Sequence, residues 1–238
     1  YDAPINEWGL ATPKFYELQK MMAKYNDGKK LPAVPKAPMA IIKVPEFKFT
    51  EYKPLSYGIG KEKESNAPLS FEDMDMGWGT MVYETQVPAI EGTSTLTGEF
   101  HDFAQVYVNG KYVGKIDRVK NEKSLELPAM PQGAQLTIVV EGMGRINFGR
   151  AIKDYKGIIG NVTLSTQKQD CELALTPTRW NNSTIADDYQ TAVNALAMPT
   201  NKMRGLQTKA GYYRGYFNIK KVGDTFINME AFGKGQVY

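Results

Sequence analysis

The sequence has few of the residue types that carry chemistry at neutral pH. Its 238 residues include one cysteine, Cys171, and one histidine, His101. A single cysteine excludes a disulfide within the chain and any zinc site built from several thiolates. A catalytic triad or a histidine-rich metal site would have to include His101. We therefore expect no metal and no cofactor.

Long hydrophobic runs and a strong charge of one sign are also absent. The apolar run at 136–140 is far shorter than the roughly 20 residues of a membrane-spanning helix, so we expect no membrane span. The net charge is +3, and both signs are interspersed, as in the stretch KEKE at 61–64. A nucleic-acid partner would require a clustered positive excess and is not expected. The 42% hydrophobic and 23% charged residues are typical of a globular protein.

One long helix is expected, near the start of the chain. Thr12 suits the N-cap and Pro13 suits the first helical position. Apolar residues then recur at spacings of three and four up to Gly28, which is a stop signal. The pattern predicts a helix within residues 12–28 whose apolar face holds Phe15, Leu18, Met22 and Tyr25.

A proline-rich stretch follows this helix. Residues 29–68 have prolines at positions 32, 35, 38, 45, 54 and 68. Proline interrupts helices and central strands. We therefore predict a connector along the surface, with short strands at 41–44 and 47–52.

Residues 69–166 alternate between apolar and polar side chains, as strands do. Asn109-Gly110 is a strong signal for a two-residue hairpin turn. Short strands separated by turn residues predict an all-β sandwich or jelly roll. The predicted strands are 80–85, 94–100, 104–108, 112–116, 123–127, 135–141 and 160–165.

The last part of the chain is more mixed. We predict strands at 172–176, 212–219 and 224–229, and a short helix within 185–196. The end, GKGQVY at 233–238, reads as a turn and the beginning of a strand. Because two residues are too few to form a full ladder, we expect the sequence to be a piece of a longer one.

Candidate catalytic residues have structural explanations. His101 and Asp102 would form a base and its orienting carboxylate, but adjacent residues on a strand point to opposite faces. We favour His101 as a polar residue at a strand corner that bonds the backbone. Paired carboxylates serve glycoside hydrolysis, but those in this sequence lie in polar, loop-like stretches and are expected to be solvated: Asp73 with Asp75, and Asp187 with Asp188.

Three further patterns have competing explanations. The stretch GMGR at 142–145 lacks the Lys-Ser/Thr ending of a phosphate loop, so we predict a tight turn between strands and a buried or interfacial pair formed by Arg145. Asn161 and Asn182 begin tripeptides that fit the glycosylation pattern. Aromatic residues that would stack on sugars are expected mostly in the core: Tyr57, Trp78, Trp180, Tyr212 and Tyr213.

Distinctive motifs run along the whole chain. They are YDAPINEWG at 1–9, GWGTMVY at 77–83, HDFAQVYVNG at 101–110, EGMGRINFG at 141–149 with DYKGI at 154–158, and GYF at 215–217 with GKGQVY at 233–238. In this order they resemble glycoside hydrolase family 35, the β-galactosidases of the lysosomal and bacterial type. There the first motif closes the last strand of a catalytic barrel, the middle motifs belong to a first accessory β-domain, and the last belong to a galactose-binding-like jelly roll. Residues 170–210 match poorly.

The resemblance implies where the chemistry lies. Members of this family are retaining exo-β-galactosidases that use two barrel glutamates, one as acid/base and one as nucleophile. Both would precede Tyr1, so no catalytic residue is expected in this chain. One substrate-binding residue is implied, Tyr1, whose phenol would bond the sugar or the nucleophile at the barrel mouth. In the chain alone, Tyr1 is expected to have no role.

The expected fold class is mainly β, with β-sandwich or jelly-roll domains preceded by the last strand and helix of a truncated (β/α)8 barrel. The expected organisation is a barrel remnant at 1–28, a proline-rich connector at 29–68, a first accessory β-sandwich at 69–166, and a linker with a truncated second jelly roll at 167–238. These β-domains would pack on the missing barrel.

The resemblance implies part of an enzyme that removes terminal non-reducing β-D-galactosyl residues from oligosaccharides or glycoconjugates. The chain would supply scaffold and be inactive alone. The family implies a periplasmic or secreted bacterial enzyme. Two alternatives stay open: a carbohydrate-binding β-sandwich module, and a structural interaction domain with an exposed apolar face.

Overall fold

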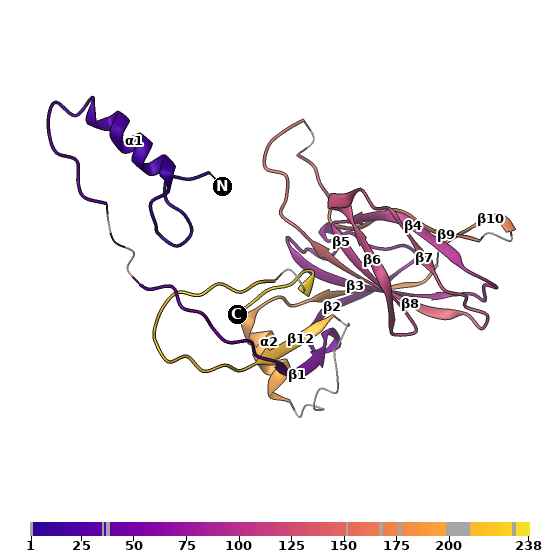
Figure 1. Ribbon diagram of the computed structural model, residues 1–238. Coiled ribbons are helices and arrows are strands. Elements are labelled where there is room, and N and C mark those ends of the chain that lie inside the picture. Colours follow the sequence, from indigo (N-terminus) through magenta and orange to yellow (C-terminus); the bar gives the residue numbers. More distant parts are fainter. Residues whose placement is uncertain are drawn as a thin grey trace. The chain divides into compact units, whose positions relative to one another are not determined.

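The computed structural model describes residues 2–34, 36, 39–150, 152–166, 169–175, 178–198, 210–229 and 232–238, with the backbone alone at 169–172. These residues are mainly β, with three antiparallel sheets and two short α-helices (Figure 1). They divide into two compact units, Tyr1–Lys48 with Tyr216–Ala231, and Phe49–Gly215 with Phe232–Tyr238. No helix in these ranges is long and apolar enough to cross a membrane.

The first unit contains helix α1 (Pro13–Ala23). Its start is as predicted, because Thr12 is the N-cap and has an extended backbone. It ends earlier than Gly28, because the N–H groups of Lys24 and Tyr25 bond carbonyls three residues back instead of four. None of the helix residues is buried.

The strands predicted at 41–44 and 224–229 are wrong. These segments share one parallel bridge, between Ile41 and Asp224, and no strand. Aromatic pairs, rather than a ladder, hold this part of the first unit. The ring centroids of Trp8 and Phe226 are 5.4 Å apart, and those of Phe47 and Phe217 are 5.0 Å apart.

The second unit contains all the named sheets of the described residues. The six-stranded sheet has the order β2 (Ile59–Ser65), β11 (Trp180–Ile185), β3 (Gly79–Val87), β8 (Ala134–Gly142), β5 (Phe103–Val108), β6 (Lys111–Asp117). The four-stranded sheet has the order β10 (Gln169–Ala174), β9 (Gly157–Thr166), β4 (Ser94–His101), β7 (Ser124–Leu127). Strands β1 (Phe49–Pro54) and β12 (Gly211–Gly215) form a third sheet, and α2 (Tyr189–Ala197) contacts both of them. Short 3-10 turns are η1 (Leu55–Gly58), η2 (Glu72–Met74) and η3 (Arg118–Lys120).

One hydrophobic core joins the two larger sheets. Alternate residues of β3 and β8 point into it, as the period of two in a strand requires. From the six-stranded sheet it includes Met81, Tyr83, Leu136, Ile138 and Val140, and from the four-stranded sheet Leu96, Phe100, Val162 and Leu164. This two-layer packing is the predicted sandwich.

The prediction missed two strands, β2 and β11. The exposed edge strand β2 reads IGKEKES, and β11 reads WNNSTI, so neither shows apolar alternation. Polar side chains of β11 are nevertheless buried, because neighbouring backbone groups satisfy them: Asn182 accepts from the Leu69 N–H and donates to the Lys63 carbonyl. Strand β11 lies between β2 and β3 although the sequence analysis assigned it to the segment after the first β-domain. The four domain boundaries stay a prediction.

Several chain segments meet at one end of this sandwich. Gly79 of β3 pairs with Gly142, the last residue of β8, and His101 pairs with Gly157, the first residue of β9. Asp102 joins β4 of one sheet to β5 of the other. We call this the network end. The opposite end holds the predicted Asn109-Gly110 turn between β5 and β6, where both residues have positive φ.

Candidate functional site

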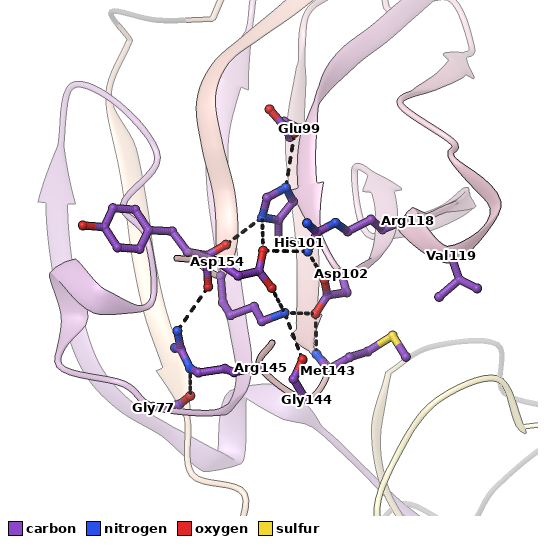
Figure 2. Close-up of polar contacts among 12 residues, drawn as sticks. Gly77, Glu99, His101, Asp102, Arg118, Val119, Met143, Gly144, Arg145 and Asp154 are labelled. Carbon is purple, nitrogen blue, oxygen red and sulfur yellow. Dashed lines mark hydrogen bonds and ion pairs between the residues drawn. The ribbon is translucent and has the colours of Figure 1, made fainter. Parts of the chain in front are cut away.

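A cluster of four charges, of which Asp102, Asp154 and Lys156 are buried and Arg118 is partly exposed, lies at the network end. The Lys156 ammonium is 2.7 Å from a carboxylate oxygen of Asp102 and 2.7 Å from one of Asp154. Arg118 Nη1 lies 2.7 Å and 2.9 Å from the other oxygens of the same two carboxylates. The Lys156 side chain is 2% exposed and each aspartate side chain 5%. Figure 2 shows this arrangement, which we call the ion cluster.

The ion cluster keeps its carboxylates ionised. Burial alone would raise the pKa of Asp102, but hydrogen bonds from Lys156, Arg118 and the Met143 N–H outweigh it and hold that pKa below its ordinary value. The pKa of Asp154 is lowered in the same way, against burial, by Lys156 and Arg118. Because buried charges are stable only when paired and hydrogen-bonded, each member depends on the other three.

The ion cluster fastens the loop that joins β8 to β9. The N–H of Met143 donates to Asp102 at 2.7 Å, and Lys156 donates to the Gly144 carbonyl at 3.3 Å. Arg145 bonds the Gly77 carbonyl at 2.9 Å (Figure 2) and Glu72 at 2.5 Å. Arg145 does form an ion pair, but the pair is partly exposed and not buried. The predicted tight turn is wrong, because GMGR begins a long loop over residues 143–156.

Between these fastened ends, the loop exposes apolar side chains. Phe148 is 84% exposed. Exposed residues of this size and number on one loop are typical of a contact surface. We call the set the loop surface, and it consists of Ile146, Phe148, Ile152 and Tyr155.

His101 is bonded to the backbone, as the sequence predicted. Its Nδ1 donates to the Tyr155 carbonyl at 2.6 Å, and its Nε2 is 3.3 Å from Glu99 (Figure 2). Among the described residues, no hydrogen bond connects the His101 imidazole to the Asp102 carboxylate. The Asp102 carboxylate instead binds Arg118, Lys156 and the Met143 N–H. The pair is therefore not arranged as a base and its orienting carboxylate.

The two other aspartate pairs differ from each other. Asp73 and Asp75 are exposed, as expected of solvated loop charges. Asp188 caps helix α2, where hydrogen bonds from the Thr191 hydroxyl and N–H lower its pKa. The prediction is wrong for Asp187, which is half-buried, and burial raises its pKa above the ordinary value.

The remaining candidates divide between core and surface. The Asn182 side chain is buried and hydrogen-bonded to backbone groups and to the Ser65 hydroxyl, which argues against glycosylation there, whereas Asn161 is exposed on β9. Trp180 is buried as predicted, and Tyr212 and Tyr213 are half-buried. Tyr57 and Trp78 are exposed, contrary to the core assignment. Tyr1 lies outside the described residues.

No sequence pattern identified Arg118, Asp154 or Lys156 as charges that pair with one another. Lys156 stands in the motif DYKGI directly before the apolar residues that begin β9. A lysine at the start of a buried strand was the available signal for a buried cation. Its partner Asp102 is 54 positions away, so no local pattern could reveal the pairing. Among the described residues no group of three or more His, Cys, Asp or Glu is placed to hold a metal.

Replacing Lys156 with methionine should destabilise the second unit strongly. The change leaves two buried carboxylates with one cation, a loss of about 3–5 kcal/mol in the free energy of unfolding. Urea denaturation followed by the fluorescence of buried Trp180 measures it. The matched control, Lys111→Met, removes an exposed lysine and should change stability by less than about 0.5 kcal/mol. Equal effects of the two substitutions would contradict the role of the cluster.

Stability should fall in acid because of the same carboxylates. The pKa of Asp102 is lower in the folded than in the unfolded chain, so the unfolded chain binds more protons as pH falls from about 5 towards 2. Asp102→Asn should make this part of the stability curve shallower. Glu141→Gln should act oppositely, because burial raises the pKa of Glu141 and its ionisation therefore costs stability at neutral pH. Urea midpoints of both variants measured across this pH range test the prediction. Equal slopes of stability against pH for the two variants would contradict it.

Comparison with known proteins fits this architecture. The family described as "Beta-galactosidase, first all-beta domain" matches residues 68–172. A β-galactosidase of Bos taurus is 30% identical over 100% of the chain, and one of Xanthomonas manihotis is 29% identical over 99%. "Beta-galactosidase 1" of Dictyostelium discoideum is 24% identical over 100%. The chain spans 38%, 37% and 38% of the lengths of these relatives. The chain is therefore similar along its length to the C-terminal part of β-galactosidases of the glycoside hydrolase family 35 type, and residues 68–172 match their first all-β domain.

Proposed function

We propose that this chain is the accessory part of a retaining exo-β-galactosidase that removes terminal non-reducing β-D-galactosyl residues. Its relatives are β-galactosidases more than twice its length, and its matched region is an accessory all-β domain of such enzymes. The observation that carries the proposal is the loop surface, which is apolar and exposed but fastened at both ends by buried charges.

The catalytic carboxylates belong to the part that this chain does not contain. A retaining glycosidase needs one carboxyl group that donates a proton and a second that acts as nucleophile. Asp102 and Asp154 cannot take these roles, because both are buried and paired with the same two cations, so neither can donate a proton to a substrate or reach its anomeric carbon. Tyr1, predicted to contact the sugar, stays a prediction.

The loop surface packs against the catalytic part. An apolar loop that is ordered before association loses little conformational entropy on docking. Its large side chains are of the kind that dominate the energy of protein interfaces. The barrel remnant at 1–28 has a matching feature, since α1 has no buried residue and exposes Tyr16, Met21 and Met22. A helix of that kind fits a larger body that would cover it.

The purified 238-residue chain should not hydrolyse a chromogenic β-galactoside. The same chain, produced together with its upstream coding sequence, should do so. Stoichiometric turnover by the shorter chain, with an active-site titrant bound in equal amount, would overturn the assignment of catalysis to the missing part.

Phe148→Asp in the longer protein should lower activity about tenfold or more. The substitution replaces a large apolar side chain of the proposed interface with a charge, which would be buried against the catalytic part. The control is Ala89→Asp, an exposed residue that follows β3 at the opposite end of the sandwich. Specific activity and the thermal midpoint of the longer protein are measured for both. In the 238-residue chain Phe148→Asp should leave the thermal midpoint unchanged. Full activity of the Phe148 variant would contradict the proposal that the loop surface packs against the catalytic part.

A further inference from the structure

A shallow cleft opens beside the first residues of β3. Its volume is about 310 Å³, at the small end of the range for small-molecule sites. Side chains from η2, from the edge strand β2 and from the end of β11 surround it. The lining residues that the argument uses are Lys61, Asp75, Trp78 and Asp187.

Trp78 presents its indole ring to solvent at this cleft. It is 64% exposed, whereas Trp180 of the same unit is completely buried. Its backbone is well held, because the preceding Gly77 carbonyl accepts from Arg145 and β3 begins at the next residue. A fixed, exposed indole is a suitable platform for the apolar face of a pyranose ring, since it combines large contact area with little flexibility.

Asp187 supplies an acceptor that the fold does not use. Its Oδ2 accepts from the Thr80 hydroxyl at 3.3 Å, and no described residue donates to its Oδ1. The carboxylate lies directly against Gly79, where a Cβ would be 2.8 Å from Oδ2, so the glycine makes room for it. Burial raises the pKa of Asp187 above its ordinary value. An ionised carboxylate has lone pairs for two donors, such as neighbouring sugar hydroxyls.

The rim of the cleft is polar and charged. Lys61 lies 3.3 Å from Asp75, and both side chains are largely exposed. Both side chains line the same cleft as Trp78 and Asp187, and they offer further donors and acceptors to a ligand there. Met74, Met76 and Ile185 also line the cleft. This mixture of apolar and charged groups suits a sugar, which has an apolar ring face and polar hydroxyls.

We propose that this cleft binds one pyranose unit of a glycan, with the ring stacked on Trp78 and two hydroxyls donating to Asp187. The choice of β-galactosides as the sugar class rests on the proposed function. Bound there, a glycan chain would be held to the enzyme through a unit other than the one hydrolysed. Such a site raises the local concentration of a polymeric or branched substrate without taking part in bond cleavage.

The test is a titration of the 238-residue chain with galactose, with lactose and with a β-galacto-oligosaccharide, followed by calorimetry and by tryptophan fluorescence. An open site with one aromatic ring should bind in the millimolar range. Trp78→Ala and Asp187→Asn should each weaken binding about tenfold. Asparagine keeps the shape of Asp187 and can still accept from Thr80, so folding should be preserved. The urea midpoint of each variant verifies this.

Matched controls separate the cleft from nonspecific effects. Trp8→Ala removes another exposed tryptophan, in the first unit, and Glu126→Gln removes an exposed carboxylate on β7. Neither should change sugar affinity. No detectable binding of any of the three sugars, or binding that all four variants leave unchanged, would overturn the proposal. So would protection of Trp78 from an aqueous quencher by the upstream part alone, since a protein contact would then occupy the cleft.

These outcomes are independent of the proposed function. If the longer protein lacks galactosidase activity while Trp78-dependent sugar binding persists, the proposed function fails and the cleft stands. If the longer protein is active and Trp78→Ala leaves both sugar binding and the KM for a long galacto-oligosaccharide unchanged, the cleft fails and the proposed function stands.

Discussion

Asp102 and Asp154 are buried together only because Lys156 and Arg118 lie between them. Removing an ion from water costs several kcal/mol, and this cost is offset only when opposite charges and hydrogen bonds replace the lost hydration. The four residues come from the β4–β5 junction, from η3 and from the loop before β9. Their pairing therefore fixes how these segments meet. The ion cluster thus fixes the second unit at the end where Asp102 joins its two larger sheets.

This constraint gives a physical basis for the contact properties of the network end. The loop over residues 143–156 has no regular secondary structure in its described part, yet Asp102, Lys156 and Arg145 hold its backbone at several points. The two ends of the segment that carries the exposed apolar side chains are therefore fixed. Preorganisation of this kind lowers the entropy lost on association. Arg145 also fixes the backbone before Trp78, so one set of hydrogen bonds supports both the loop surface and the cleft.

Sequence patterns predicted the strands in which apolar and polar side chains alternate. They missed the strands that lack this alternation. Strands β3, β5 and β8 have apolar residues at every second position, which is the local consequence of one buried face. Strand β11 buries Asn182, Ser183 and Thr184 instead. Its place between β2 and β3 depends on hydrogen bonds to residues more than 100 positions away. The same reason explains why Asp187 was taken for a solvated loop residue.

The sequence by itself determined the mainly β class, the start of α1, the Asn109-Gly110 turn and the resemblance to family 35 β-galactosidases. Each of these depends on residues close together in the chain or on motifs read in order. Only the tertiary structure decided which charges are buried, which aromatic residues reach the surface and which carboxylates lie beside the cleft. Burial and pairing are properties of neighbours in space, and Asp102 and Lys156 become neighbours only when β4, β5 and β9 have come together.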